Sequence, residues 1–226
     1  MPIPKQIIDN SNITLARYLN EILRDCPTTQ LDIATAFFQI QAYSMLKENI
    51  GNVRRFRLLL GKSPEIKNDK TLGSELLSVV EQEVETFELS KEKQDEVTTL
   101  TNFLKKENVE VRIYDKGFLH GKAYIFDEIV IIGSSNFTPS GLTHNTELNS
   151  VALAAEANYT RQHWFEKFWV ESVDFKEQLV ELLENSRYGS KEYSPHEVYI
   201  KALYELQKDD IKPPDTKIST LLQKAK

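Results

Sequence analysis

Short apolar runs that are rich in β-branched and aromatic residues alternate along this chain with stretches of helical periodicity, and that alternation restricts the possible folds most. Leu31–Phe38 (LDIATAFF) is typical of a strand, and Gln39–Glu48 is typical of a helix that ends near Gly51. Phe56–Leu60, within VRRFRLLLG, is typical of a buried strand. The three segments predict a β-α-β unit, which is a building block of α/β proteins.

The same alternation continues beyond this unit. A polar loop leads into a helical region over Leu72–Glu107, whose apolar residues recur every three or four positions and whose continuity breaks near Ser90. Four further runs are typical of strands, and a turn at Asp127-Glu128 joins the second of them to the third. These runs are Val109–Tyr114, Lys122–Phe126, Ile129–Ile132 and Thr146–Ala155. We therefore expect an α/β sandwich with a mixed sheet.

The chain turns helical from Asn158 onward, and we expect its end to form a separate part. Four aromatic residues there are spaced to pack against a core: Trp164, Phe165, Phe168 and Trp169. Beyond Ser186 the sequence is polar and turn-rich and then helical, with Pro213-Pro214 before a short amphipathic end. These features predict a main domain over residues 1–170 and a C-terminal helical extension or connector over residues 171–226.

The single cysteine, Cys26, excludes an intrachain disulfide and a cysteine-rich zinc site. A chain of 226 residues buries enough apolar surface to fold without such a crosslink. Its first residues do not resemble an export signal, and no apolar run is long enough to span a bilayer. We therefore expect a cytoplasmic protein with no membrane partner.

The net charge is 28 − 34 = −6, which counts against a nucleic-acid partner because phosphate binding depends on Lys and Arg. The acidity is local, however. Between Glu65 and Glu96 the chain carries ten acidic and four basic residues, a difference of −6, so the remainder holds 24 of each and is neutral. We interpret the acidic stretch as a solvated helix face. The charge then predicts a DNA affinity that is modest and sensitive to salt.

The residues best suited to chemistry lie between His120 and Asn149. His120 and Lys122 stand two apart at the start of a predicted strand, so their side chains project from the same face. Ser134 and Asn136, at the end of the next strand, share a face as well. If the two strands form a hairpin, one small volume holds an imidazole, a fixed positive charge and neutral donors. That set suits a phosphoryl group, whose charge builds on its non-bridging oxygens during displacement.

This stretch resembles the HKD signature of the phospholipase D superfamily, which includes bacterial endonucleases. The matching residues are His120-x-Lys122, then Asp127, then Gly133-Ser134-Ser135-Asn136. The order of elements is similar from Leu31 to Trp169, although only the thirty residues that begin at His120 form a motif. The resemblance implies a phospholipase D-like α/β sandwich with a mixed sheet.

The resemblance also implies roles for single residues. His120 would attack phosphorus to form a covalent phosphohistidine, Lys122 and Asn136 would hold the phosphate oxygens, and Ser134 would be an auxiliary donor. Family nucleases carry a glutamate beyond the asparagine that hydrogen-bonds the other ring nitrogen of the nucleophile. Glu147 stands in that place.

Two residues of the motif have open or altered roles. Ser135 either contacts phosphate or caps the following segment. Asp127 is separated from Gly133 by five residues (EIVII) instead of the usual six. Because the shortening falls at the hairpin turn, we interpret Asp127 as a turn residue.

One such signature occurs in the chain, because His144, His163 and His196 have no lysine two residues on. The family mechanism uses two histidines, one as the nucleophile and one to protonate the leaving oxygen. The second must then come from another chain, which predicts a twofold-symmetric homodimer with two His120 imidazoles at one phosphate. No histidine or carboxylate cluster has the spacing of metal ligands, and the family chemistry is metal-independent. We therefore expect neither a metal nor a cofactor.

A basic cluster is the candidate for substrate binding outside the motif. Arg54, Arg55 and Arg57, with Lys62, stand together without acids. Arg55 and Arg57 share a strand face and could track a nucleic-acid backbone, although charged residues also protect edge strands from aggregation. The sequence shows no amphipathic helix with a basic face, and it therefore gives no indication that the chain binds a lipid surface. The sequence therefore favours a metal-independent phosphodiesterase or endonuclease that acts on DNA.

A second resemblance concerns the context of the chain. IGSSNFTPSGLTHNTELN and YSPHEVYIKALYEL resemble the phospholipase D-like module that precedes superfamily 2 helicase motors of bacterial restriction or repair type. The chain has no Walker A sequence, and its end at ISTLLQKAK has no domain-ending signal, so we expect a fragment whose helicase domain follows. Two alternatives stay open: a non-catalytic module that binds DNA or a partner, and a phosphodiesterase that acts on lipids.

Overall fold

The computed structural model describes residues 7–26, 30–61, 72–88, 90–189 and 195–207. The chain divides into two units, Met1–Ser190 and Lys191–Lys226, and the second contains helix α10 (Pro195–Gln207). The first unit extends beyond the expected boundary at residue 170. Strand β8 (Val173–Asp174) pairs with the sheet, and helix α9 (Lys176–Asn185) buries its apolar side chains in the core of that unit.

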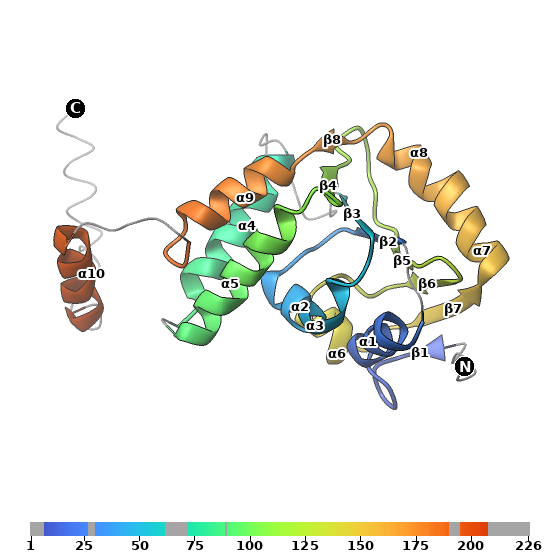
Figure 1. The fold of residues 1–226 in the computed structure, drawn as a ribbon, viewed down its shortest axis with the longest axis horizontal. Coiled ribbons are helices and arrows are strands. Elements are labelled where there is room, and N and C mark those ends of the chain that lie inside the picture. The colour runs from blue at the N-terminus through green and yellow to red at the C-terminus, as the bar shows by residue number, and fades with distance from the viewer. Residues whose placement is uncertain (1–6, 27–29, 62–71, 89, 190–194, 208–226) are drawn as a thin grey trace, which may run out of the picture. The chain divides into compact units, whose positions relative to one another are not determined.

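One mixed sheet lies at the centre of the first unit (Figure 1). In the described part of the chain it has eight strands in the order β1-β7-β6-β5-β2-β3-β4-β8. The neighbours β2, β3 and β4 are parallel, and the other neighbouring pairs are antiparallel. The remaining strands are β1 (Ile7–Ile8), β2 (Gln30–Thr35), β3 (Arg55–Leu60), β4 (Val109–Ile113), β5 (Lys122–Ile125), β6 (Ile129–Gly133) and β7 (Asn149–Leu153). This sheet confirms the α/β class, the parallel β2–β3 pair and the β5–β6 hairpin.

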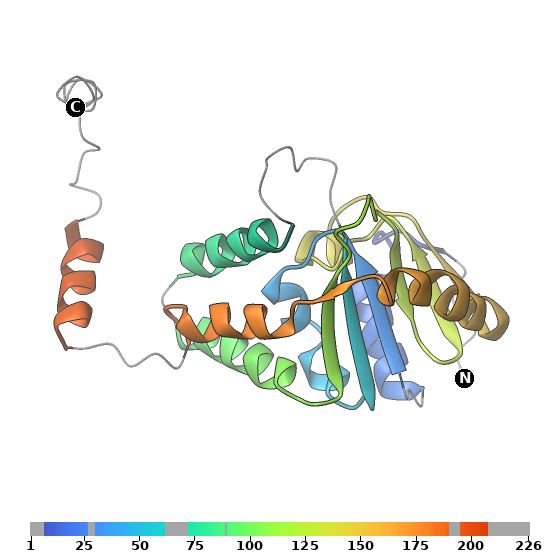
Figure 2. The ribbon, with the colours of Figure 1, turned by 90° about the horizontal axis from the view of Figure 1, so that it is seen from above.

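Helices cover both faces of this sheet, as Figure 2 shows. One face carries the chain segment α7 (Ala154–Tyr159), η1 (Thr160–Phe165) and α8 (Glu166–Trp169), in which η1 is a π-helical turn. The other face carries α9 and six more helices. These are α1 (Leu15–Asp25), α2 (Ile40–Ser44), α3 (Lys47–Ile50), α4 (Leu72–Thr86), α5 (Lys91–Leu104) and α6 (Pro139–Thr143). No helix in the described ranges is long and apolar enough to cross a membrane.

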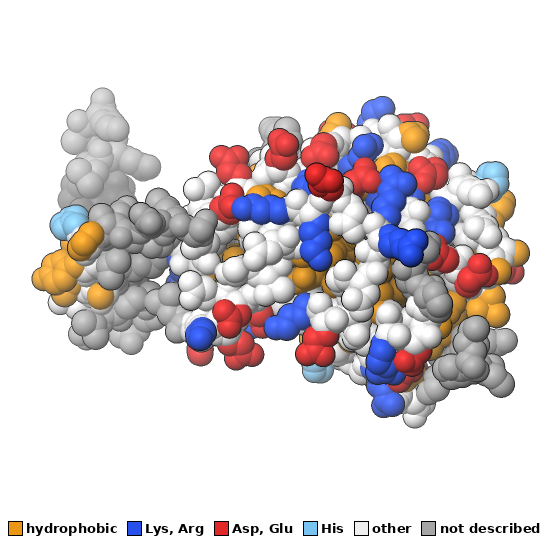
Figure 3. All heavy atoms as spheres, in the orientation of Figure 1, with side chains coloured by type: hydrophobic (Ala, Val, Ile, Leu, Met, Phe, Trp, Pro, Cys, Tyr) orange, Lys and Arg blue, Asp and Glu red, His pale blue; other side chains and the backbone are white. Residues whose placement is uncertain are grey.

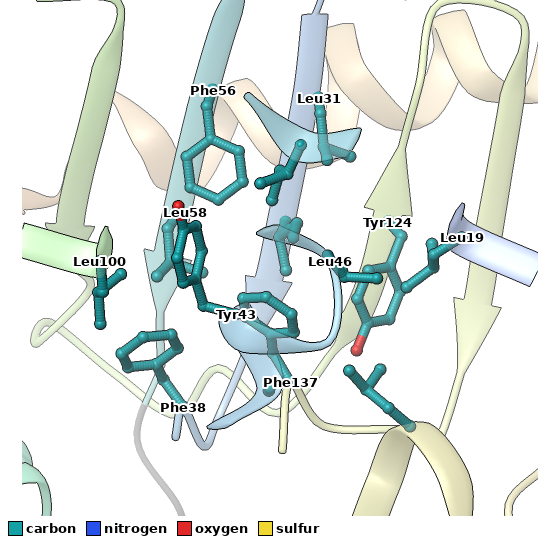
Figure 4. Close-up of a cluster of buried hydrophobic side chains, with 14 of the residues drawn as sticks. Leu19, Leu31, Phe38, Tyr43, Leu46, Phe56, Leu58, Leu100, Tyr124 and Phe137 are labelled. Atoms are coloured by element: carbon teal, nitrogen blue, oxygen red, sulfur yellow. The ribbon is translucent and has the colours of Figure 1, made fainter. Parts of the chain in front are cut away.

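Alternation along the strands divides the apolar side chains between two cores. In β2, Ile33 lies in the larger core under α1 to α6 and α9, whereas Ala34 lies in the smaller core under α7 to α8. In the larger core the rings of Tyr43 and Phe56 both pack against Phe103, with centroids 5.0 and 5.2 Å away, and Figure 4 shows Tyr43 and Phe56 among their neighbours. The central strands β2 and β3 are therefore buried on both faces, which fixes their register.

The long acidic helical region is two helices, as the sequence predicts. Ser90 separates α4 from α5 and caps the second helix, because its hydroxyl accepts a hydrogen bond from the Lys93 amide at 3.2 Å. Some acidic residues of this region are not fully solvated. Glu96 is 8% exposed and pairs with Lys93 at 2.9 Å. Glu83 accepts hydrogen bonds from the amides of Ile40 and Gln41, and its burial raises the pKa of its carboxyl group.

A buried ion cluster holds the π-helical turn to the sheet. Asp32 on β2 is fully buried, and its carboxylate accepts hydrogen bonds from Arg57 Nε at 2.7 Å and from Arg161 Nε at 2.8 Å. Arg57 is 2% exposed, also pairs with Glu166 on α8, and lies over two aromatic rings of that segment. The expectation that Arg57 contacts substrate is therefore wrong, because its charge is used inside the protein.

Strand β3 offers a matched pair of arginines that tests this cluster. Replacing Arg57 with Ala leaves the buried Asp32 carboxylate with one partner fewer, and we expect the free energy of unfolding to fall by about 3–5 kcal/mol. Arg55, two residues away, is half exposed and pairs with Glu110 at 2.9 Å. Arg55→Ala is expected to cost about 0–1 kcal/mol. Urea unfolding followed by circular dichroism measures both, and equal losses would contradict the structural role given to Arg57.

Candidate active site

One edge of the sheet collects the ends of the strands that carry the motif. Lys122 at the start of β5 pairs with Gly133 at the end of β6, and Gly133 pairs with Asn149 at the start of β7. On the other side of β5, Ala123 pairs with Ala34, so that Thr35 at the end of β2 reaches the same edge. The antiparallel register thus brings together segments that are more than one hundred residues apart in sequence.

His120 and Lys122 are in direct contact at this edge. The Lys122 ammonium Nζ lies 2.7 Å from Nε2 and 3.0 Å from Nδ1 of His120, and it donates to the His120 carbonyl oxygen at 2.9 Å. An ammonium group this close to both ring nitrogens repels a second positive charge on the ring. The contact therefore selects the neutral imidazole.

Electrostatics favour that neutral form as well. Partial burial lowers the pKa of His120, and the positive charge of Lys122 lowers it further. Lys122 itself is 5% exposed, and burial lowers the pKa of its ammonium group while the charge of Glu147 opposes that effect. His120 is exposed at the rim of the site. The site thus combines an accessible, uncharged imidazole with an enclosed cation.

Asn136 is anchored to the end of β2. Its side-chain oxygen Oδ1 faces the Thr35 hydroxyl at 3.2 Å and accepts a hydrogen bond from the Ala36 amide at 3.3 Å. The Thr35 hydroxyl also accepts from the Phe137 amide at 3.1 Å, which ties the loop after β2 to the loop after β6. With Oδ1 held by the backbone, the Nδ2 amino group is the end of Asn136 that is left to donate to a ligand. Thr35 lies 101 residues before Asn136, so the local sequence does not mark it as part of the site.

Glu147 contacts Ser134 rather than the imidazole. The Ser134 hydroxyl donates to Glu147 Oε2, and Asn145 Nδ2 donates to Glu147 Oε1 at 3.3 Å. The Leu148 amide donates to the Ser134 hydroxyl at 3.0 Å. Among the hydrogen bonds of the described residues, none joins Glu147 to His120. Ser134 therefore positions Glu147 in this chain, and the hydrogen bond that the resemblance implies is not formed.

Ser135 is fully buried and is not available to a substrate. Its hydroxyl accepts from Asn149 Nδ2 at 2.9 Å, and its carbonyl oxygen accepts from the Tyr124 hydroxyl at 3.1 Å. Asn149 Nδ2 also faces the Ile8 carbonyl at 3.2 Å, and so connects β1 to the loop after β6. Of the two roles left open for Ser135, the phosphate contact is wrong, because the side chain faces the interior.

The other polar candidates lie at the opposite end of the sheet. Arg55 begins β3 and pairs there with Gln30, the first residue of β2. Asp127 lies in the turn after β5, at the far end of that strand from Lys122, with Arg161 3.8 Å away. The structure brings neither Arg55 nor Asp127 to His120, which agrees with the interpretation of Asp127 as a turn residue.

The loop that carries His120 is held by close packing at Gly121. A Cβ atom at this position would lie 2.5 Å from the ring of Trp164 in η1, so only glycine fits between His120 and Lys122. Trp164 comes three residues after Arg161, which binds Asp32. The buried ion cluster thus places the ring against which the motif loop rests. The aromatic spacing around Trp164 predicted a core helix but gave no sign of this contact.

Comparison with known proteins identifies a family that agrees with the geometry of the site. The family model described as "Cardiolipin synthase, PLD-like domain" matches residues 26–169. The chain belongs to the phospholipase D-like (PLD-like) family. Members of this superfamily are phosphodiesterase-type hydrolases or transferases. No curated protein matches the chain.

Several solved structures are similar to this PLD-like chain. Nuc from Salmonella typhimurium, a phospholipase D family member, is 18% identical with a TM-score of 0.47, over 75% of this chain and 95% of Nuc. NucT from Helicobacter pylori is 16% identical with a TM-score of 0.43, over 71% of this chain and 91% of NucT. Phosphatidylserine synthase from Haemophilus influenzae is 13% identical with a TM-score of 0.49, over 93% of this chain and 48% of the synthase. In the part of the PLD-like chain that the structure describes, no three His, Cys, Asp or Glu side chains gather as metal ligands.

The lowered pKa of His120 can be measured directly. We expect its imidazole to titrate below 6.5, the ordinary value, and Lys122→Met to raise the midpoint because it removes the adjacent positive charge. Lys116→Met, which removes an exposed lysine four residues before His120, should leave the midpoint unchanged. Imidazole C–H resonances followed by NMR against pH give these values, with His120→Asn for assignment. A midpoint at or above 6.5 would contradict the electrostatics described above.

Proposed function

We propose that this chain is a metal-independent phosphodiesterase that cleaves DNA through a covalent phosphohistidine at His120. The observation that supports it most is the contact between the enclosed Lys122 ammonium and the neutral imidazole, next to the anchored Asn136. A phosphodiester carries one negative charge on its non-bridging oxygens. The ammonium group and the Asn136 amino group are suited to hold those oxygens while the imidazole faces phosphorus.

The reaction then has two steps at phosphorus. In the first, a ring nitrogen of His120 attacks, a P–N bond forms, and the bond from phosphorus to the leaving oxygen breaks with its electron pair on that oxygen. A second acid protonates the leaving oxygen. In the second step that group, now a base, removes a proton from water, the water oxygen attacks phosphorus, and the P–N bond breaks. The cycle returns His120 to its neutral form.

We propose that the second acid is the protonated form of His120 from a second copy of the chain, a form that the negative charge of the bound phosphodiester favours at one of the two coupled imidazoles. An exposed apolar row next to the site supports a contact between copies. Ile132 on β6 and Ile7 on β1 flank Ser150 of β7 in register, so all three side chains lie on one face, and the isoleucines are 46% and 52% exposed. Leu148, which precedes β7, is 64% exposed. Apolar side chains grouped in this way favour burial against a partner surface.

DNA is proposed as the substrate because His120 is exposed at the rim of the sheet, where an extended backbone can reach it. The charge distribution favours weak binding that depends on salt. Figure 3 shows Lys and Arg side chains interspersed with Asp and Glu over the face in view, without a continuous basic surface there. Delivery by an attached domain would offset that weakness. We therefore also propose that the chain is the phospholipase D-like module of a protein with a superfamily 2 helicase motor, as its resemblance to such modules suggests.

A binding module without turnover is the second candidate. The observation that favours it is that Glu147 contacts Ser134 and Asn145 instead of the imidazole. In that arrangement the same cation and amide donors would hold a DNA phosphate, and His120 would only contact it.

A nuclease assay with and without EDTA separates the two candidates. We expect the chain to cleave DNA in excess EDTA and His120→Ala to lower the rate by about a thousandfold or more, because the substitution removes the proposed nucleophile. His163→Ala, which removes an exposed histidine of η1, should keep full activity. Fluorescence anisotropy measures DNA binding by the same three proteins. Binding without cleavage by the unaltered chain would support the second candidate instead.

Mixing experiments test the shared site. When unaltered chains exchange subunits with His120→Ala chains, a site that needs both imidazoles should lose activity as the square of the unaltered fraction. A linear fall would contradict the sharing of one site.

The apolar row has its own test. Ile132→Lys is expected to convert the dimer to monomers and to abolish cleavage, as measured by light scattering and the nuclease assay. Val170→Lys, at a 71% exposed position after α8, is the matched control and should leave both unchanged. An active monomer would overturn the dimer proposal.

A further inference from the structure

An aromatic ring in solvent lies directly beside the candidate nucleophile. Phe118 belongs to the loop between β4 and β5 and is 61% exposed, whereas its neighbour Leu119 is 3% exposed and lies in the smaller core. The ring of Phe118 lies against the imidazole of His120, with centroids 5.4 Å apart and planes inclined by 11°. The function proposed above gives this ring no role.

Close packing of the loop backbone just after Phe118 holds this ring in place. A Cβ atom at Gly61, at the end of β3, would lie 2.1 Å from the Leu119 carbonyl oxygen, so the loop rests directly on that glycine. Gly121 is held in the same way by Trp164. Phe118 is therefore presented to solvent by a loop whose backbone is closely packed at Leu119 and Gly121, just after the ring, and this packing limits the rearrangement that a ligand requires.

The position of the ring suits one kind of ligand group. A base and its phosphate are joined by a single sugar, so a phosphate held by Lys122 and facing His120 places an adjacent base near Phe118. Bases stack on aromatic side chains through their π-faces, and this contact tolerates any sequence. A base inside a duplex is already stacked on its neighbours and cannot use such a ring without leaving the helix. A lipid headgroup or a simple phosphodiester offers nothing to stack.

We propose that Phe118 is a stacking platform for the nucleobase next to the phosphate at His120, and that the site therefore takes single-stranded nucleic acid. This inference rests on the proposed function and adds a binding subsite and a substrate class to it.

A double-mutant cycle tests the platform by binding alone. It compares a short oligodeoxythymidylate with an abasic strand of the same length, both labelled, and all proteins carry His120→Asn to prevent turnover. We expect Phe118→Ala to weaken binding of the thymidylate strand by about tenfold or more and to leave binding of the abasic strand unchanged. Phe118→Trp should restore the affinity for thymidylate.

The chain offers a matched control for this cycle. Tyr159 on α7 is 67% exposed and lies against His163 with centroids 4.7 Å apart, so it repeats the pairing of an aromatic ring with a histidine at another place on the surface. Tyr159→Ala should change neither affinity. A loss on Phe118→Ala that is equal for thymidylate and abasic strands would overturn the platform and give Phe118 a role in positioning His120. A fall in dimer mass on Phe118→Ala, with no dependence on the base, would place the ring at the contact between copies instead.

The outcome for Phe118 can be separated from the outcome for the proposed function. If the unaltered chain cleaves DNA in a His120-dependent manner but Phe118→Ala does not distinguish thymidylate from abasic strands, the platform is wrong and the phosphodiesterase stands. If base-dependent coupling at Phe118 is found without any cleavage, Phe118 is a stacking platform and the chain is a binding module without turnover. Cleavage of a duplex at the same rate as a single strand would contradict the proposed substrate class.

Discussion

The carboxylate of Asp32 lies fully buried on a central strand, and the rest of the structure depends on the ion pairs that neutralise its charge. Two arginines meet it, Arg57 from the adjacent strand and Arg161 from the π-helical turn, so the charge fixes η1 to the sheet. A lone buried carboxylate costs several kcal/mol, and the cluster therefore permits little alternative packing of this segment. The turn places Trp164 against Gly121, within the motif itself. The buried ion cluster therefore influences the geometry of the candidate site, because both contact the same π-helical turn η1.

The site is built where strands end, which explains why its parts come from distant segments. Lys122, Gly133 and Asn149 are brought into line by antiparallel pairing, and Thr35 connects the end of β2 to Asn136. The polar groups around Asn136 and Ser135 bond mostly to backbone atoms of neighbouring loops. Such bonds fix the position of the loops, and the groups best placed to meet a ligand are the Lys122 ammonium, the Asn136 amino group and the imidazole. These three groups suit a displacement at phosphorus, which needs one nucleophile and neutralisation of the charge on the phosphate oxygens.

Local patterns in the sequence predicted most of the fold. The β-α-β unit, the break at Ser90 and the β5–β6 hairpin each follow from periodicity, a cap or a turn within a few residues. Helix α1 was not predicted, although Thr14 caps it and its apolar residues recur at helical spacing. The spacing of two residues within a strand also predicted that the side chains of His120 and Lys122 lie close together. Local patterns misassigned Arg57 and left the role of Ser135 open, because whether a polar side chain faces a partner or solvent depends on long-range register. The contact between Ser134 and Glu147 also depends on long-range register, and no local sequence pattern predicts it.

The central step of the proposed reaction is the covalent bond between His120 and phosphorus. The direct test is to mix the chain with labelled single-stranded DNA in EDTA, stop the reaction within the first turnover at alkaline pH, and map the adduct by peptide mass spectrometry. We expect a nucleotide on the peptide that contains His120, stable to base and labile to acid, and none on the His120→Ala chain. Cleavage without any adduct on that peptide, or an adduct on a different residue, would contradict the covalent step.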